Sequence, residues 1–291
     1  MPPRKRSLTA RTADKYVLYQ EAVQGPEVDA RFLSRHYRRT IGRAPRILRE
    51  DFCGTAILAC WFVHLHRENH AFGVDLHGPT LAWGRKHTVP RLPEAEQSRV
   101  KLVKANVMDV SRPRADIIAA LNFSYGIFKT RAALSAYLRN SRRSLRQDGL
   151  LFLDAWGGSD TQRERPDRIK NRGFVYVWDQ VRFDPVSYHT LCRIHFEFPD
   201  GTRIRNAFDY DWRLWTLPEL QELMAEAGFR DIHVLWEGTH RKTGKGNGVF
   251  HRVTKGHADR AWIAYVVGRA GAPATGRSAP PARARRSSPR R

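Results

Sequence analysis

Five short apolar runs, separated by stretches of helical patterning, occupy residues 46–154 and limit the chain to a small set of folds. The runs lie at 46–50, 71–75, 100–103, 116–121 and 149–154, and helices are expected at 57–66, 79–86 and 130–146. Because neighbouring parallel strands need a long crossover connection, usually a helix, this alternation predicts a parallel sheet with helices on both faces. Later apolar runs at 232–236 and 262–267 bring the predicted sheet to seven strands.

The rhythm changes after Gly157-Gly158. Residues 159–172 are polar and are expected to form a loop, whereas apolar and polar residues alternate with period two from 174 to 215. Pro199-Asp200-Gly201 is typical of a hairpin turn between two such strands. The segment 159–215 is therefore predicted to be an antiparallel β insertion in a doubly wound α/β fold.

The predicted core consists of two parts, 44–158 and 216–269, because a capped helix that starts at Thr216 resumes the α/β pattern after the insertion. Before the core, two amphipathic helices are expected within 13–37, with Gly25-Pro26 between them. We interpret residues 13–43 as a helical lid.

The chain of 291 residues carries 51 Lys and Arg against 29 Asp and Glu, a net charge of +22. Ten of these charges lie in two ends without acidic residues, 1–12 and 270–291, which leaves +12 for residues 13–269. Both ends have too few apolar residues to form a core and are predicted to be disordered. The basic surface and ends are compatible with nucleic-acid binding, and equally with a solvated surface that has no polyanion partner.

Several classes of protein fit the sequence poorly. No apolar run approaches the roughly 20 residues that span a membrane, and the basic N-terminus has no apolar stretch behind it as a secretory signal would. The three cysteines show neither a disulfide nor a zinc spacing, so we expect a cytoplasmic protein. His66 and His70 lie four residues apart without a third ligand, and no metal site is expected.

The first predicted strand-turn-helix, residues 48–56, contains the residues most indicative of chemistry. Parallel sheets bind ligands at the carboxyl ends of their strands. With one glycine, no lysine, and Glu50 and Asp51 leading into it, this turn does not fit a phosphate loop and favours a cationic ligand. Asp75, 21 residues after Gly54, is placed to accept ribose hydroxyls, and the Asn106 amide follows the third strand, where an adenine edge would lie. Together these features indicate an adenosine joined to an amino acid, without phosphate.

These strings resemble the class I S-adenosylmethionine-dependent methyltransferases, which have a Rossmann-like fold. The likeness covers roughly residues 44–269 and depends on segments 50–56, 74–76, 106–107, 215–220 and 227–229. The string Leu-Arg-Glu-Asp-Phe-Cys-Gly-Thr is similar to that of a poorly characterised bacterial branch. In the first motif, Phe52 and Ala56 stand where the family usually has glycines.

For the methionine part of S-adenosyl-L-methionine, the resemblance implies contacts from Glu50 and from the backbone of the turn, namely Cys53, Gly54, Thr55 and Ala56. For the rest of the cofactor, it implies that Asp75 binds the ribose and that Leu76 lies against the adenine. Asn106 and Val107 would bind the adenine edge, and Asn122 would lie near the sulfonium.

The acceptor of the methyl group is not recognisable in the sequence. Candidates for catalysis are Asn122 and Tyr125, and candidates for the substrate pocket or lid are Tyr16, Tyr19, Asp154 and Tyr210. Because a lid and a β insertion would enclose the pocket, we expect a small-molecule acceptor that receives the methyl group on nitrogen or oxygen. Two alternatives stay open: an RNA or protein methyltransferase with the same cofactor, and a non-catalytic nucleic-acid-binding protein on this fold. The oligomeric state is left open.

Overall fold

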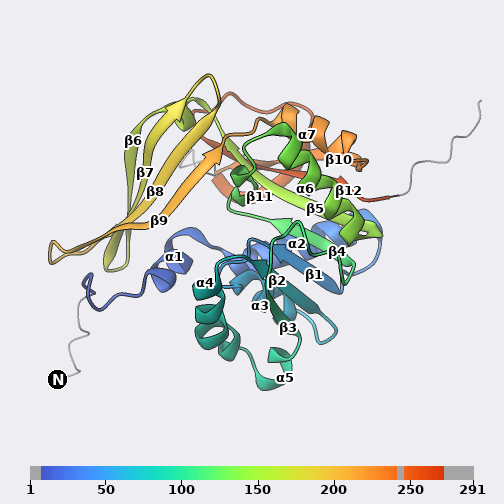
Figure 1. The fold of residues 1–291 in the computed structure, drawn as a ribbon, viewed down its shortest axis with the longest axis horizontal. Coiled ribbons are helices and arrows are strands. Elements are labelled where there is room, and N and C mark those ends of the chain that lie inside the picture. Colours follow the sequence, from blue (N-terminus) through green and yellow to red (C-terminus); the bar gives the residue numbers. More distant parts are fainter. Residues whose placement is uncertain (1–7, 241–245, 272–291) are drawn as a thin grey trace, which may run out of the picture.

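The computed structural model describes residues 8–240 and 246–271, which form two β-sheets with helices around the larger one (Figure 1). Sheet A has eight strands in the order β11-β10-β12-β5-β4-β1-β2-β3. These strands are β1 (Ile47–Asp51), β2 (His70–Asp75), β3 (Val100–Lys104), β4 (Ala115–Ala120), β5 (Leu145–Gly157), β10 (Arg230–Thr239), β11 (Gly246–Val253) and β12 (Trp262–Arg269). Sheet B, in the order β6-β7-β8-β9, consists of β6 (Arg165–Asn171), β7 (Phe174–Asp184), β8 (His189–Glu197) and β9 (Arg203–Arg213).

Sheet A is mostly parallel, as the alternation of strands and helices predicts. β1 pairs in parallel with β2 and β4, β2 with β3, and β4 with β5. β12 runs antiparallel to β5 and to β10, and β11 is antiparallel to β10. The predicted number of seven strands is wrong, because β11 adds an eighth at the edge. Its glycine-rich start, Gly246-Asn247-Gly248, is typical of a loop, and the hairpin pairing with β10 makes it a strand.

Helices pack on both faces of sheet A. Along β4, Ile117 belongs to the apolar cluster under α2 and α3, whereas its neighbour Ile118 belongs to the cluster under α6 and α7. The α-helices are α1 (Lys15–Val23), α2 (Pro26–Ile41), α3 (Ile57–His64), α4 (Gly78–Trp83), α5 (Glu94–Gln97), α6 (Arg131–Ser144) and α7 (Leu217–Glu226). No helix in residues 8–240 and 246–271 is long and apolar enough to cross a membrane.

The two N-terminal helices have different surroundings, which corrects the predicted lid of residues 13–43. α2 packs on α3, and its Leu33 and Tyr37 are fully buried in the core of sheet A. α1 instead contributes Leu18 to the apolar cluster of sheet B, together with Phe174 and Phe196. Only α1 therefore lies between the two sheets, where a lid would act (Figure 1).

Part of the predicted disordered N-terminus is ordered. Leu8 packs against the apolar cluster of sheet B, and the Ala10 backbone N–H donates a hydrogen bond of 2.9 Å to the Thr202 hydroxyl. The predicted disorder of 1–12 is thus wrong for residues 8–12. Residues 1–7 and 272–291, the remainder of the two basic ends, lie outside the described part of the chain.

The predicted loop at 159–172 is also wrong, since it contains β6 and a 3-10 turn at Ser159–Gln162. β6 is an edge strand that pairs only with β7, and five of its seven residues are charged or proline. Charges and proline are common on edge strands because they prevent pairing with other chains. The charged and proline-containing sequence that suggests a loop is therefore typical of an edge strand protected against pairing with another chain.

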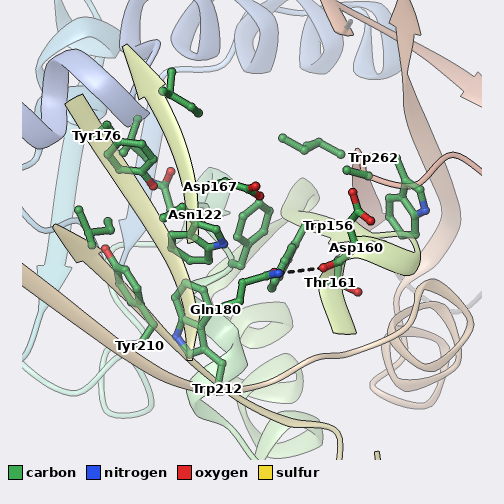
Figure 2. A pocket seen from close by; sticks show the side chains of 18 of the residues that line it. Asn122, Trp156, Asp160, Thr161, Asp167, Tyr176, Gln180, Tyr210, Trp212 and Trp262 are labelled. Atoms are coloured by element: carbon green, nitrogen blue, oxygen red, sulfur yellow. Dashed lines mark hydrogen bonds between the residues drawn. The ribbon is translucent and has the colours of Figure 1, made fainter. Parts of the chain in front are cut away.

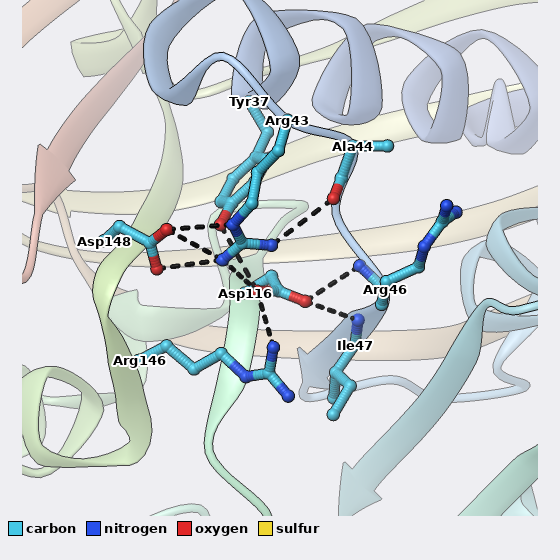
Figure 3. A network of polar contacts seen from close by, with 8 residues as sticks. All are labelled: Tyr37, Arg43, Ala44, Arg46, Ile47, Asp116, Arg146 and Asp148. Carbon is cyan, nitrogen blue, oxygen red and sulfur yellow. Dashed lines mark hydrogen bonds and ion pairs between the residues drawn. The ribbon is translucent and has the colours of Figure 1, made fainter.

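At the amino end of sheet A, the buried carboxylate of Asp116 ties β1 to β4 (Figure 3). It accepts hydrogen bonds from the backbone N–H groups of Arg46 (2.8 Å) and Ile47 (2.9 Å) and from the guanidinium of Arg43 (2.8 Å). Burial alone would raise the pKa of Asp116, but the hydrogen bonds from Arg43 and the two backbone groups lower it below its ordinary value.

We expect Asp116→Asn to lower the free energy of unfolding by about 2 kcal/mol at pH 7, because bonds to a charged acceptor become bonds to a neutral one. Since the folded-state pKa is lowered, this contribution is present above pH 4 or so, and it is lost as the pH falls through that lowered value. Urea unfolding of the wild type and the variant at pH 7 measures the cost of the substitution, and the same comparison at pH 3 measures how much of it is lost. Asp148→Asn, which changes a half-exposed partner of Arg43, should cost less than about 1 kcal/mol.

Candidate active site

The turn between β1 and α3 contains three residues with unusual backbone geometry. Phe52, Gly54 and Ala56 all have a left-handed conformation, with φ of 59°, 54° and 58°. Non-glycine residues adopt this conformation at a cost of about 1 kcal/mol or more, and such strain gathers at functional sites. Phe52 and Ala56 therefore occupy positions that glycine would occupy with less strain, which explains why a glycine-rich pattern is usual there.

Asp75, at the end of β2, fixes this turn. Its Oδ2 accepts a hydrogen bond from the Gly54 N–H and its Oδ1 one from the His77 N–H, both at 2.8 Å. Each carboxylate oxygen has two lone pairs, so Asp75 retains acceptor capacity on the side that faces solvent. The carboxylate is thus held rigidly at the carboxyl ends of β1 and β2.

A cavity of about 420 Å³, the first cavity, opens above this turn. It is large enough for a nucleoside-sized ligand. Nine of the residues predicted for the site line it, from α1, the β1–α3 turn, β2, the β4 end and β9: Tyr16, Tyr19, Glu50, Cys53, Gly54, Thr55, Asp75, Asn122 and Tyr210. The structure therefore brings together residues that lie almost 200 positions apart in the sequence.

The charges around the first cavity are acidic, though less so than the sequence suggests. Burial raises the pKa of Glu50 to about 8, although a hydrogen bond from the Ala59 N–H (3.0 Å) opposes the shift. Asp51 is neutralised beneath the cavity, because the buried guanidinium of Arg49 bonds both of its carboxylate oxygens, at 2.6 and 2.9 Å. Glu50 and Asp75 are therefore the carboxylates of the β1 and β2 ends that remain for a cationic ligand.

Four residues predicted to contact the cofactor do not line the first cavity. Ala56 is buried at the start of α3, and Leu76 is 60% exposed beside Asp75. The Asn106 side chain accepts a hydrogen bond of 3.0 Å from the Met108 N–H within its own loop. Val107 is buried, and its carbonyl accepts bonds from Arg49 and Asn140.

A second cavity, of about 440 Å³, lies between sheet B and the carboxyl end of β5 (Figure 2). Its walls are largely aromatic and include Trp156, Trp178 and Trp262. The sequence prediction missed this set. The alternation Tyr176-Trp178 and Tyr210-Trp212, which places large aromatic rings on one face of two strands, is a signal that could have indicated it.

Four residues line both cavities and form the wall between them: Tyr19, Asn122, Tyr210 and Trp212. The side chains of Tyr19 from α1 and Tyr210 from β9 lie next to each other, and the rings of Tyr210 and Trp212 lie 4.4 Å apart. Burial raises the pKa of Tyr19 to about 12. The wall thus presents neutral hydroxyl groups and one amide to both cavities.

Asp154 holds Asn122 in this wall. Asn122 and Phe123 are both left-handed, with φ of 55° and 57°. Asp154 accepts hydrogen bonds from both backbone N–H groups, at 2.7 and 2.9 Å. Asp154 is buried and lines neither cavity, which corrects its predicted place in the substrate pocket. Burial raises its pKa to about 7, against those two hydrogen bonds.

Tyr125, predicted as catalytic, is also placed elsewhere. It is 3% exposed, and burial raises the pKa of its hydroxyl well above the ordinary value. It lines neither the first nor the second cavity and packs in the core cluster under α6 and α7. Within residues 8–240 and 246–271, no three His, Cys, Asp or Glu side chains converge as a metal site.

Comparison with known proteins gives a fold and no close relative. No model of a protein family matches the chain, and no curated protein matches it. Among solved structures, the CcbJ methyltransferase from Streptomyces caelestis aligns with a TM-score of 0.62 and 16% identity, over 86% of this chain and 97% of that one.

Two further structures align similarly. S-adenosylmethionine-bound CalS10, an amino pentose methyltransferase from Micromonospora echinaspora, gives a TM-score of 0.59 at 17% identity over 86% of this chain and 95% of that one. The sugar N-methyltransferase KedS8 from Streptoalloteichus gives a TM-score of 0.58 at 17% identity, over 92% of this chain and 96% of that one. At these identities the comparisons show a shared methyltransferase-like α/β fold.

Proposed function

We propose that this protein is an S-adenosylmethionine-dependent methyltransferase that holds its cofactor in the first cavity and a small-molecule acceptor in the second. The observation that carries the proposal is the wall of Tyr19, Asn122, Tyr210 and Trp212, which is common to both cavities. Methyl transfer needs donor and acceptor in contact and in line, and two cavities that meet at one wall supply that arrangement. The acceptor atom is nitrogen or oxygen.

The residues of the first cavity fit such a cofactor. Glu50 lines this cavity and suits a cationic ammonium group, and Asp75 has acceptor capacity for ribose hydroxyls. We propose that Leu76, exposed beside Asp75, covers the adenine, whereas Asn106 and Val107 are engaged within the protein. The three solved structures compared above are named as methyltransferases, which supports the same assignment.

The protein's part in the reaction is to position groups and exclude water. The bound cofactor supplies an electrophilic methyl group on a sulfonium. Since the raised pKa of Tyr19 keeps its hydroxyl neutral near pH 7, Tyr19 orients the acceptor by hydrogen bonding and does not remove its proton. The Asn122 side chain bonds no other described residue, so its amide is available to the reacting groups. The unpaired cysteines support a reducing cytoplasm as the compartment.

The proposal is tested by calorimetric titration with S-adenosylmethionine. We expect wild-type protein to bind one equivalent and Asp75→Asn to bind about tenfold more weakly, because two charge-assisted hydrogen bonds to the turn and those to the ligand are weakened. Asp109→Asn, which changes an exposed carboxylate outside both cavities, is the matched control and should bind as the wild type does. Absence of binding to the wild type would refute the proposal.

Cofactor binding should release a proton from Glu50. Its pKa of about 8 means that the free protein holds Glu50 largely protonated at pH 7, and a cationic ligand favours the carboxylate. The affinity should therefore fall, by about three- to tenfold, as the pH decreases from 7.5 to 6.5. Calorimetry in two buffers of different ionisation enthalpy counts the protons. Glu50→Gln should abolish this component, and equal proton release by both proteins would contradict the assignment.

A further inference from the structure

The second cavity has an aromatic panel on one side. Eight aromatic side chains line it, and three of them, Trp178 on β7 and Tyr210 and Trp212 on β9, pack against one another as a panel. Their rings lie 4.4–6.2 Å apart and are inclined to one another by only 30–36°. Trp156 meets this panel edge-on, at 88° to Trp178. A surface of this shape is complementary to a flat ring.

Most polar side chains in the same cavity already have partners. The Gln180 amide donates to the carbonyl groups of Asp160 (2.8 Å) and Arg163 (2.7 Å). Thr161 donates to the Gly158 carbonyl at 2.8 Å, and Asp160 is paired with arginines. A polyhydroxylated ligand needs many free donors and acceptors, because each buried hydroxyl without a partner costs about 1–3 kcal/mol. Between its two ends the cavity offers the Tyr176 hydroxyl and the indole N–H groups of its tryptophans, and an indole can donate a hydrogen bond but cannot accept one.

The inner end is the wall shared with the first cavity, where the Asn122 side chain lies. At the outer end, which we call the rim, lie Asp167 and Glu237. Asp167 is the cross-strand neighbour of Trp178 and shares Arg165 with Asp160. Glu237 accepts only a backbone hydrogen bond, from Gly248, and has no cationic partner among the described residues. Because Arg165 also lines the cavity, the rim carries the two carboxylates of Asp167 and Glu237 against one guanidinium, on a chain whose net charge is +22.

We infer that the acceptor is a flat, largely apolar aromatic ring system that carries a positive charge or hydrogen-bond donor at the end remote from the methylated atom. The inference depends on the proposed function, since it assigns the second cavity to the acceptor. The ring lies against Trp178, Tyr210 and Trp212, the nucleophilic atom points toward Asn122, and the charged end meets Asp167 and Glu237. An anionic acceptor is disfavoured by the rim, and a sugar by walls in which most polar side chains already have partners and the indoles accept no hydrogen bonds.

Three simple probes test the inference by calorimetry on the full chain saturated with S-adenosylhomocysteine. Tryptamine has an aromatic ring and an ammonium group, indole-3-acetate has the same ring with a carboxylate, and glucosamine has an ammonium group without an aromatic ring. We expect tryptamine to bind at least tenfold more tightly than either of the others. Trp178→Ala should weaken tryptamine binding by about three- to tenfold. Trp61→Ala, a tryptophan outside both cavities, should leave it unchanged.

The outcomes separate the two proposals. Lack of binding of S-adenosylhomocysteine would overturn the proposed function and, with it, this inference. If S-adenosylhomocysteine binds and glucosamine binds as tightly as tryptamine, or tryptamine does not bind at 10 mM or so, the acceptor class alone is overturned. Asp167→Asn should reduce the preference for tryptamine over indole-3-acetate, and an unchanged preference would overturn the role of the rim.

Discussion

Replacement of Arg49 by methionine is expected to lower the free energy of unfolding by about 3–5 kcal/mol. Arg49 is 2% exposed and bonds both carboxylate oxygens of Asp51 and the Val110 carbonyl, which it reaches at 2.6 Å. Without the guanidinium, a buried charge remains at the end of β1 with only the Tyr137 hydroxyl, at 2.8 Å, as a side-chain partner. Urea unfolding followed by tryptophan fluorescence measures the loss.

The control for this prediction is Arg46→Met, three residues earlier in the chain. Arg46 pairs with Glu68 at the surface, where both side chains are at least one-third exposed, so its loss should cost no more than about 1 kcal/mol. A similar cost for the two variants would contradict the view that the Arg49–Asp51 pair supports the β1–α3 turn from below.

Asp154→Asn is expected to lower kcat by about 100-fold while the affinity for S-adenosylmethionine changes less than about threefold. The carboxylate keeps Asn122 and Phe123 in a strained backbone conformation, and an amide in its place would oppose an N–H donor to an N–H donor. A displacement of about 1 Å at the wall suffices for such a loss of rate. Asp154 is a positioning residue in this account, since it touches neither cavity.

Two further measurements distinguish positioning from general damage. Because the pKa of Asp154 is about 7 and the carboxylate form accepts both hydrogen bonds, kcat of the wild type should fall as the pH decreases through 7 or so. Asp148→Asn, at the opposite end of β5, should leave both kcat and this pH profile unchanged. If kcat falls equally in both variants, the rate does not depend on the hydrogen bonds by which Asp154 holds Asn122 and Phe123.

Local sequence patterns were sufficient to predict the central strands of sheet A and the break between the first two helices. The apolar runs gave the strands β1 to β5 within a few residues, and the Gly25-Pro26 break placed the boundary between α1 and α2. The edge strands β6 and β11 escaped detection because half of each backbone faces solvent, and their charged or glycine-rich sequences match those of loops.

The same distinction holds for the candidate site. Glu50, Gly54 and Asp75 follow strands that are neighbours in the sheet, so their convergence could be predicted from strand order. Asp51 seemed equivalent to Glu50 in the sequence, but alternate strand residues face opposite sides, and only Asp51 meets the buried Arg49.

The alternation of aromatic residues along β7 and β9 indicates an aromatic face on each strand, but the cavity itself could not be predicted, because it depends on how sheet B lies against the end of β5. Trp156, Trp178 and Trp212 come from strands in both sheets, and no local pattern indicates that their side chains converge. The role of Asp154 was hidden for a similar reason, since the backbone it holds belongs to the β4 end, some 30 residues away.

The central claim is that a methyl group passes from the cofactor in the first cavity to an acceptor in the second, where the two cavities meet beside Tyr19, Asn122, Tyr210 and Trp212. The direct measurement is incubation of the protein with S-adenosylmethionine, labelled in the methyl group, in a whole-cell extract that contains small molecules, RNA and protein, followed by mass spectrometry. We predict that wild-type protein transfers the label to a low-mass compound and that Asp154→Asn, which still binds the cofactor, transfers about 100-fold less. Tight cofactor binding with label recovered only in RNA or protein, or in no product, would contradict the account.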